Sequence, residues 1–180
     1  MKPLLRTDRL ELWQPMASDL PGLYALTEAE ETRRWLGGLI PSMADSFTRL
    51  HRNAGSWHLH GYGTFMVRLQ GQPQIIGNCG VFRSWRGLPG LDDVAEAGWI
   101  IHHAHSGQGI AGEAMRAALA WFDSTHGAQR VGCMIEQGNT ASHRLAAALG
   151  FAEYARQPDP EGRELVLYER VPAKELSGLV

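Results

Sequence analysis

A short apolar run that passes through a histidine-rich turn into a glycine-rich segment is the feature that most constrains this chain. It covers residues 95–112, reads AEAGWIIHHAHSGQGIAG, and leads into an alanine-rich stretch. The first turn of a helix exposes N–H groups that no helical carbonyl accepts, and the aligned peptide dipoles make that end partly positive. Because Gly107, Gly109 and Gly112 have no side chains, an anion can approach those N–H groups closely. The segment therefore predicts a strand, a turn and a helix whose start holds a phosphate or pyrophosphate.

One interpretation of this pattern is a dinucleotide site, because residues 107–112 match G-x-G-x-x-G literally. A strand expected at 130–136 ends at Glu136, near where a ribose-binding carboxylate would lie, so an oxidoreductase that uses NAD or FAD is one hypothesis. Two observations oppose it. The apolar run ends at Ile101, well before Gly107, and the motif lies too late in the chain for the repeated units of a doubly wound domain. A Walker A loop is excluded because no Gly-Lys-Ser/Thr follows.

A second interpretation rests on a family pattern that extends beyond the glycines. Residues 96–102 (EAGWIIH) and 107–114 (GQGIAGEA) resemble the segment of the GNAT N-acyltransferases that binds acetyl-coenzyme A. Residues 7–12 (TDRLEL) are similar to the opening strand of that family, and residues 139–142 (NTAS) and 149–151 (LGF) to its N-x-x-S and L-G-F motifs. These pieces occur in the family's order over most of the chain, and they look most like the RimJ/RimL-like branch.

The resemblance implies one GNAT domain over residues 1–180 with an α/β (α+β) fold. In that fold a mixed, mostly antiparallel central sheet carries helices on both faces. Many members have Arg or Gln directly before the first glycine, where this chain has Ser106. Since the backbone donors do not depend on that side chain, we expect binding to persist. Arg116 and the nearby histidines are the candidates for supplying the missing cation.

Hydrophobic periodicity predicts the order of the elements. Helices are expected at 19–36, 43–54, 109–126 and 140–149, and strands at 9–14, 64–69, 74–82, 94–101, 130–136, 151–156 and 163–170, with a hairpin turn at 70–73 and a loop at 84–93. A capping-box pattern at Ser42 and Asp45 starts the second helix. Two helices have apolar stripes, made of Met43, Phe47, Leu50 and Ala54 in the second, and of Ile110, Ala114, Ala117, Ala118 and Trp121 in the third.

Length and composition agree with an enzyme of the cytoplasm. A chain of 180 residues can bury a sizeable core, and a net charge of −2 gives no reason to expect nucleic acid or a membrane surface as partner. No apolar run approaches the about twenty residues that span a bilayer, and charge comes too early in the chain for a signal-peptide core. Cys79 and Cys133 lie in apolar runs and are interpreted as small buried hydrophobes rather than catalytic thiols.

The activity implied by the resemblance is direct transfer of an acetyl group from acetyl-CoA to a primary amine, either a protein N-terminus or a small molecule. In the family the pantetheine arm follows the strand equivalent to residues 98–101, and a main-chain N–H near Ile100 or Ile101 stabilises the oxyanion. The cofactor-binding residues implied here are Trp99, Ile100, Ile101, His102, Ser106, Gly107, Gln108, Gly109, Ile110, Ala111, Gly112 and Asn139. A catalytically silent acyl-CoA-binding sensor of the same fold is a further alternative, and the chain is expected to be a monomer or a homodimer.

Two residues are the catalytic candidates. Glu96 is the candidate base, acting directly or through a water, because a carboxylate in an otherwise apolar strand is poorly solvated and therefore more basic. The alternatives are a solvated carboxylate at a sheet edge and a buried one held by an arginine. Ser142 matches the family's serine and is the candidate proton donor to the leaving thiolate, since the position one turn later is Ala146 rather than the tyrosine of many members. Asn139 would contact the pantetheine amide, although it is also a good helix N-cap.

The histidines raise the hypothesis of a metal site. His102, His103 and His105 lie together, and His58 and His60 could approach from another element. No carboxylate or cysteine completes a ligand set at a recognisable spacing, so no metal is expected. His102 or His103 could instead assist proton transfer, because imidazole titrates near physiological pH.

Three tryptophans bear on the acceptor. Trp35, Trp57 and Trp85 fall in the N-terminal helices and loops, which cover the acceptor side in this family. The ordinary role of each is core packing or partial surface exposure. If two of them line a cleft, an apolar or aromatic amine is favoured over a small charged one.

Overall fold

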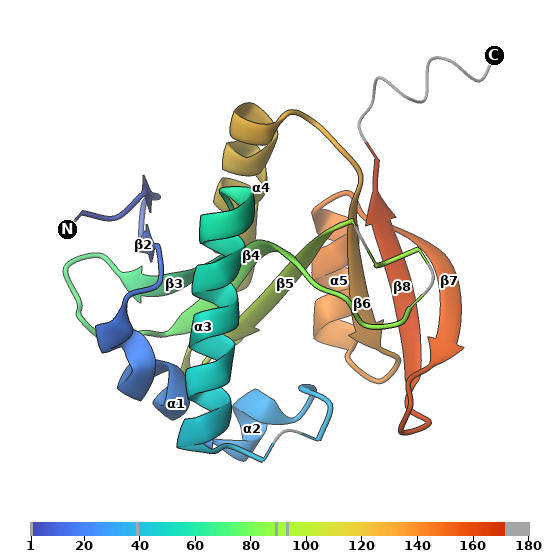
Figure 1. Cartoon of the computed structure of the whole chain (residues 1–180), viewed down its shortest axis with the longest axis horizontal. Coiled ribbons are helices and arrows are strands. Elements are labelled where there is room, and N and C mark those ends of the chain that lie inside the picture. Colours follow the sequence, from blue (N-terminus) through green and yellow to red (C-terminus); the bar gives the residue numbers. More distant parts are fainter. Residues whose placement is uncertain (1, 39, 89, 93, 172–180) are drawn as a thin grey trace.

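An eight-stranded sheet extends through the computed structural model, which describes residues 2–38, 40–88, 90–92 and 94–171 (Figure 1). Its strands are β1 (Leu5–Arg6), β2 (Leu10–Trp13), β3 (Thr64–Leu69), β4 (Gly77–Arg83), β5 (Ala95–Ile101), β6 (Val131–Glu136), β7 (Ala152–Pro158) and β8 (Glu164–Arg170). They lie in the order β1-β2-β3-β4-β5-β6-β8-β7, and among them β5 and β6 form the parallel pair. The expected mixed, mostly antiparallel sheet is confirmed. This topology excludes a doubly wound dinucleotide domain, whose sheet is mostly parallel.

Helices cover both faces of the sheet, as expected. They are α1 (Leu20–Glu28), α2 (Glu30–Arg33), α3 (Met43–His60), α4 (Ile110–His126) and α5 (Thr140–Ala148). Figure 1 shows α1 and α3 in front of the sheet and α4 and α5 behind it. Because side chains alternate along a strand, Met66 of β3 packs with Leu23 and Leu50 of the front helices, whereas its neighbour Phe65 packs against Trp121 of α4. The sheet therefore has an apolar cluster on each face.

The parallel strands β5 and β6 separate soon after they begin. They pair only Ala95 with Val131 and Glu96 with Gly132. Beyond this point β5 stays paired with β4 and β6 stays paired with β8. The backbone groups of residues 97–101 that point away from β4 therefore have no strand partner in the described sheet. This split leaves one edge of β5 open opposite β6 and α5.

Element boundaries follow the sequence prediction closely, with a few differences. The expected helix over 19–36 is broken at Ala29, whose ψ of 129° is extended, and α3 continues to His60. The two-residue strand β1 was not predicted. The tail 172–180 of the predicted domain, and positions 89 and 93 of the predicted loop, lie outside the described residues. Across the described helices, none combines the length and apolar character that crossing a membrane requires.

The buried face of α3 corrects a sequence prediction. Of its predicted apolar stripe only Leu50 is buried, while Met43, Phe47 and Ala54 are exposed. The helix instead turns polar side chains inward, including Asn53 and Ser56, because these bond backbone groups of β3 and of the turn before it. Asn53 pairs with both backbone groups of residue 64, at 2.8 Å each, and Ser56 donates to the carbonyl of residue 62 at 2.8 Å. The stripe predicted for α4 is confirmed: Ile110, Ala114 and Ala118 are buried, and Ala117 and Trp121 pack against them.

Candidate active site

A cavity of about 1110 Å³ occupies the split between β5 and β6. Its walls come from α2 and the following loop, α3, and the facing parts of β4, β5 and β6. The loop after β4, the start of α4, the connection into α5, α5 itself and the β7–β8 turn complete them. Most predicted site residues line it, namely Glu96, Trp99, Ile100, Ile101, Ser106, Gly107, Gly109, Ile110, Ala111, Gly112, Asn139 and Ser142. The cavity thus joins the predicted phosphate cradle to both predicted catalytic residues.

The start of α4 has the geometry of an anion site. Gly109 is the N-cap at a φ of +76°, and Gly107 has a φ of +74°, a left-handed backbone that glycine adopts without strain. Within the described residues, the backbone N–H groups of Ile110, Ala111 and Gly112 donate to no acceptor. A Cβ on Gly107 would meet no atom within 4 Å, so this part of the wall is open. Three free donors and the helix dipole therefore face the cavity.

Arg116 is a cation beside this anion site. Its Nη1 atom lies 3.2 Å from where a Cβ on Gly112 would be, and the residue lines the same cavity. The side chain extends back from the second turn of α4 toward the helix start, which is the usual direction of a helical side chain. The positive charge that Ser106 does not provide is thus available one helical turn away.

Glu113, an acid in the first turn of α4, faces away from the phosphate cradle. Its carboxylate accepts hydrogen bonds from the Thr7 hydroxyl and from Arg9, whose Nε lies 2.7 Å away. Burial raises the pKa of Glu113, but the hydrogen bonds from Thr7 and Arg9 outweigh this effect and lower it overall. The carboxylate therefore ties the β1–β2 turn to α4 and does not compete for the anion site.

Ser142 lies at the open edge of β5, held from two sides. The indole Nε1 of Trp99 donates to its Oγ at 3.1 Å, and its own backbone N–H donates to the Asn139 side chain, also at 3.1 Å. A serine hydroxyl has one hydrogen and two lone pairs. Because the indole uses a lone pair, the hydroxyl hydrogen of Ser142 stays available for a group in the cavity. Asn139 is the N-cap of α5, so the capping role that the sequence indicated is confirmed.

Glu96 is buried, with 3% of its surface exposed, and is bound by an arginine. Arg86 forms two hydrogen bonds of 2.9 Å with it, one to each carboxylate oxygen, and the Ser84 hydroxyl donates to Oε2. This is the buried, arginine-held arrangement that the sequence left as an alternative. A carboxylate offers about four acceptor positions, and three are used here, so Oε1 has one left. Glu96 and Trp99 lie on opposite faces of β5, since three positions separate them along the strand.

Gln108 is one of two predicted cofactor-binding residues that do not line the cavity. Its carbonyl accepts from Nη1 of Arg9 at 2.9 Å, and its side chain donates to the carbonyl of Ala104 at 3.0 Å. These bonds hold the turn before α4 in place from outside. Gln108 therefore supports the shape of the cradle without lining it.

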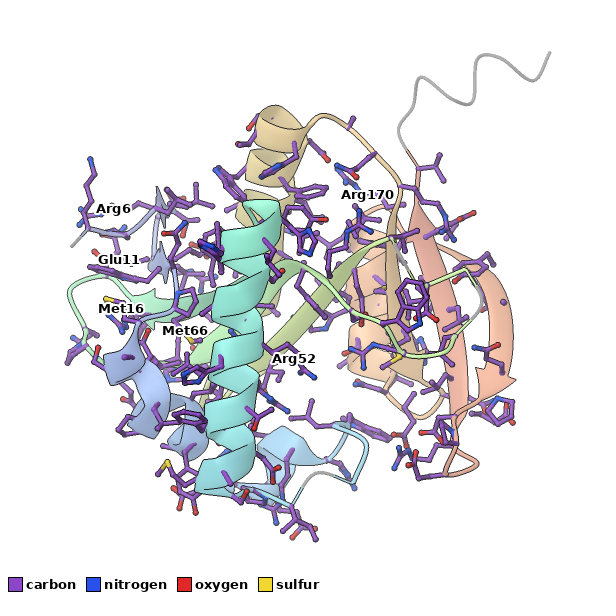
Figure 2. All side chains as sticks on the ribbon, in the orientation of Figure 1. Arg6, Glu11, Met16, Arg52, Met66 and Arg170 are labelled. Atoms are coloured by element: carbon purple, nitrogen blue, oxygen red, sulfur yellow. The ribbon has the colours of Figure 1, made fainter. Side chains whose placement is uncertain are left out.

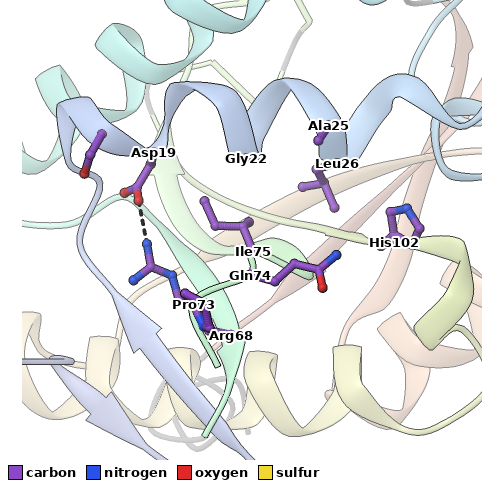
Figure 3. Close-up of a pocket in the computed structure, with 10 residues that line it drawn as sticks. Asp19, Gly22, Ala25, Leu26, Arg68, Pro73, Gln74, Ile75 and His102 are labelled. Carbon is purple, nitrogen blue, oxygen red and sulfur yellow. Dashed lines mark hydrogen bonds and ion pairs between the residues drawn. The ribbon is translucent and has the colours of Figure 1, made fainter. Parts of the chain in front are cut away.

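His102 is the other predicted cofactor-binding residue that does not line the cavity. It lines a separate pocket of about 210 Å³ instead (Figure 3). There Asp19 and Arg68 form an ion pair at 2.5 Å, so their charges compensate each other. Burial, together with the neighbouring His103 and His105, lowers the pKa of His102 and favours its neutral ring. In the described part of the chain, no group of three or more His, Cys, Asp or Glu side chains is arranged to hold a metal ion.

Two of the three tryptophans line the cavity. They are Trp35, after α2, and Trp85, after β4, whereas Trp57 packs in the core against Phe65. The ring of Trp35 lies 2.8 Å from where a Cβ on Gly138 would be, so it packs directly on that glycine. Since Gly138 connects β6 to α5, the loop after α2 reaches across the split and closes one end of the cavity.

Both cysteines are free and buried, as the sequence predicted. Cys79 has no exposed surface, and burial raises its pKa to about 12. Burial, with a smaller effect from the Glu96 charge, also raises the pKa of Cys133. Neither sulfur is a thiolate at neutral pH, so neither is a nucleophile in the native protein.

Two cavity arginines on α3 were not predicted from the sequence. They are Arg49 and Arg52, and Figure 2 shows Arg52 on the flank of α3 that faces the C-terminal strands. Charged residues on an amphipathic helix are ordinarily solvent-facing, so their spacing alone gave no signal. A signal existed in the polar residues Asn53 and Ser56, which continue the same flank one turn later, but it could be interpreted only with the sheet in place.

Comparison with known proteins agrees with this geometry. The family model described as an acetyltransferase (GNAT) domain matches residues 9–152. The uncharacterized N-acetyltransferase YoaA of Bacillus subtilis (strain 168) is 26% identical over 152 residues, which cover 84% of each protein. A GnaT-family acetyltransferase structure from Bordetella pertussis is 33% identical with a TM-score of 0.84, covering 93% of this chain and 98% of that one.

A more distant structure shares the fold. RimL, a ribosomal L7/L12 alpha-N-protein acetyltransferase in complex with coenzyme A, is 18% identical with a TM-score of 0.72, covering 92% of this chain and 95% of that one. The family match extends over most of the chain and includes the split strand, the glycine-rich turn and the start of α5. The chain therefore belongs to the GNAT family of acetyltransferases.

Proposed function

We propose that this acetyltransferase uses acetyl-CoA and transfers its acetyl group to a primary amine by direct attack. One observation carries the proposal: the free N–H groups at the start of α4 and the open edge of β5 face the same cavity. The diphosphate of the coenzyme fits the first, because backbone donors and the helix dipole favour an anion there. The amide groups of the pantetheine arm fit the second, because residues 97–101 offer unpaired backbone groups as a strand edge does.

The chain's own residues can serve each step of the transfer. The amine nitrogen forms a bond to the thioester carbonyl carbon, and a backbone N–H near Ile100 or Ile101 stabilises the resulting oxyanion. As the carbon–sulfur bond breaks, the hydroxyl of Ser142 gives its hydrogen to the thiolate and regains one from water. The proton lost by the amine goes to Oε1 of Glu96, directly or through a water, and from there to solvent, which balances the proton that Ser142 takes from water.

We also propose that the chain belongs to the RimJ/RimL-like branch, on two supports. The sequence carries the N-x-x-S and L-G-F motifs at residues 139–142 and 149–151. RimL, by its name an alpha-N-protein acetyltransferase and bound to coenzyme A, has the same fold. The acceptor is then a protein N-terminus or a small amine. Trp35 and Trp85 in the cavity wall favour one with an apolar or aromatic body.

A ligand screen followed by a turnover assay tests this proposal. Acetyl-CoA and CoA should raise the Tm of the wild type, and NAD and FAD should not, because a ligand that binds the native state alone stabilises it. Release of free CoA with a panel of aromatic amines then measures turnover. Glu96→Gln should lower kcat while leaving the acetyl-CoA-induced shift in Tm unchanged. A shift with NAD or FAD alone would overturn the proposal, and acetyl-CoA binding without turnover of any amine would indicate the acyl-CoA sensor instead.

A further inference from the structure

Arg49 and Arg52 form a cationic pair on the α3 wall of the cavity. They lie three positions apart on the helix, on neighbouring parts of one flank, and both line the cavity. Two other arginines in the wall are neutralised by the protein itself: Arg86 binds Glu96, and Arg163 binds Asp159 at 2.5 Å. In the described chain no acidic side chain forms an ion pair with Arg49 or Arg52.

The hydrogen bonds of α3 locate this pair near the strand along which the thioester is proposed to lie. Asn53, one turn beyond Arg49, is bonded to the backbone of Thr64, and the Thr64 hydroxyl is bonded to Asn78 at 3.2 Å. Asn78 of β4 is directly opposite Ile100 of β5. The pair therefore lies on the α3 side of the sheet, whereas the phosphate cradle and Arg116 belong to α4 on the other side.

Arg49 is held in an electrostatically unfavourable state. Its Nη1 atom is shielded from solvent and donates to no acceptor in the described structure. Burial and the neighbouring cation of Arg52 lower the pKa of Arg49, with Asp45 opposing them. A buried donor without a partner and two adjacent like charges are both costly, and a bound anion would relieve both costs.

We propose that the acceptor amine carries an anionic group, a carboxylate or a phosphate, which Arg49 and Arg52 bind. A guanidinium forms paired hydrogen bonds with either oxyanion, so both groups suit the site. Trp35, after α2 in the same wall, would contact the apolar body of that acceptor. Glu31 of α2 and Glu136 of β6 also line the cavity, but within the described residues neither forms an ion pair with these arginines. The inference deepens the proposed function and rests on it.

The phosphates of the coenzyme are the other source of such an anion. Arg116 already stands beside the cradle at the start of α4, so the α3 pair is not needed there. The two sources predict different kinetics. An acceptor site changes the kinetic parameters of the amine, and a coenzyme site changes the KM of acetyl-CoA.

Matched amines test the inference. 4-(2-Aminoethyl)benzoate and 4-(2-aminoethyl)benzamide differ only in the carboxylate, and tyramine phosphate and tyramine differ only in the phosphate. For the wild type we expect kcat/KM to be about 10- to 100-fold higher for at least one anionic amine than for its neutral partner. Two variants should each remove most of that ratio while the KM of acetyl-CoA stays unchanged. They are Arg52→Gln, at an exposed position, and Arg49→Lys, which keeps the charge but loses the paired N–H donors of the guanidinium. Arg156→Gln is the control, because this exposed arginine of β7 lies outside the cavity and should keep the full ratio.

Binding separates failure of this inference from failure of the proposed activity. Calorimetric titration of both pairs of amines into the CoA-loaded protein needs no turnover. Tighter binding of either anionic amine than of its neutral partner, lost in Arg52→Gln, supports the anion site even if no amine is acetylated. Equal binding and equal kcat/KM within both pairs would overturn the inference, as would a raised KM for acetyl-CoA in Arg52→Gln, which would assign the arginines to the coenzyme.

Discussion

At the scale of single residues, the hydroxyl of Ser142 is already positioned for its proposed role as proton donor. The indole of Trp99 occupies a lone pair of its oxygen, and capping by Asn139 fixes its backbone. Both contacts leave the hydroxyl hydrogen free and hold it at the open edge of β5. Glu96 differs, because Arg86 and Ser84 occupy three of its acceptor positions and leave one on Oε1.

Ser142→Ala should lower kcat about a hundredfold and leave the KM of acetyl-CoA unchanged, because the lost group acts on the leaving thiolate. Trp99→Phe keeps the ring but removes the indole donor, so a smaller fall in kcat is expected. Initial rates of CoA release measure both. Ser124→Ala, at an exposed position of α4, is the control and should match the wild type. A wild-type kcat in Ser142→Ala would exclude this serine from the mechanism.

At the scale of elements, the start of α4 and the open half of β5 together form the proposed coenzyme site. β5 ends at Ile101, a short turn reverses the chain, and Gly107 and Gly109 then direct the first N–H groups of α4 into the cavity. The residues between the two elements bond to each other and to Arg9, which fixes the distance between strand and helix.

Gly107→Ala should raise the Kd of acetyl-CoA at least tenfold, because a methyl group would enter the open wall of the cradle. Gly71→Ala is a matched control, since Gly71 has a φ of +71° and likewise no atom within 4 Å of an added Cβ, but lies in the β3–β4 turn. Both variants should lose about 1–2 kcal/mol of stability through the same left-handed strain. Calorimetric titration and thermal unfolding separate the two effects. Equal loss of acetyl-CoA affinity in both variants would show that strain, and not the cradle, is responsible.

The proposed coenzyme site could be predicted from the sequence because its motif is local. The glycines, the strand before them and the helix after them are adjacent in the chain, and so is the capping Asn139 before α5. The ion pair of Glu96 with Arg86 could not be assigned, because Arg86 lies in a loop whose path periodicity does not determine. The inward polar flank of α3 was missed for a related reason: Asn53 and Ser56 are buried because β3 and the turn before it present backbone groups to them.

At the scale of the whole molecule, Glu113 joins distant parts of the chain. It binds Thr7 and Arg9, more than a hundred positions away in the sequence, and so ties the N-terminal strands to α4. Its pKa is lowered below the ordinary 4.5, because the hydrogen bonds from Thr7 and Arg9 outweigh the opposing effect of burial. A depressed pKa in the folded state means that the stabilisation is complete above pH 4.5 and is lost as pH falls through the folded value.

Glu113→Gln should therefore lower the stability at pH 7 by about 1 kcal/mol, or about 2–4 °C in Tm. The difference from the wild type should shrink as pH falls below 4.5, when the wild-type carboxylate is protonated. Thermal unfolding at pH 7, 5, 4 and 3 measures this. Glu153→Gln, which removes an exposed ion pair with Arg156, should leave Tm unchanged at every pH. A difference between Glu113→Gln and wild type that does not vary with pH would show that the contact is not ionic.

The burial of Cys79 and Cys133 has a consequence for the product side of the reaction. In the reaction proposed above, each turnover would release the free thiol of coenzyme A into a cavity that neither cysteine lines, since both are buried. Under oxidising conditions the released coenzyme A therefore cannot form a mixed disulfide with a cysteine of the native enzyme. Inhibition by that product should be fully reversible and should not depend on the redox state of the solution.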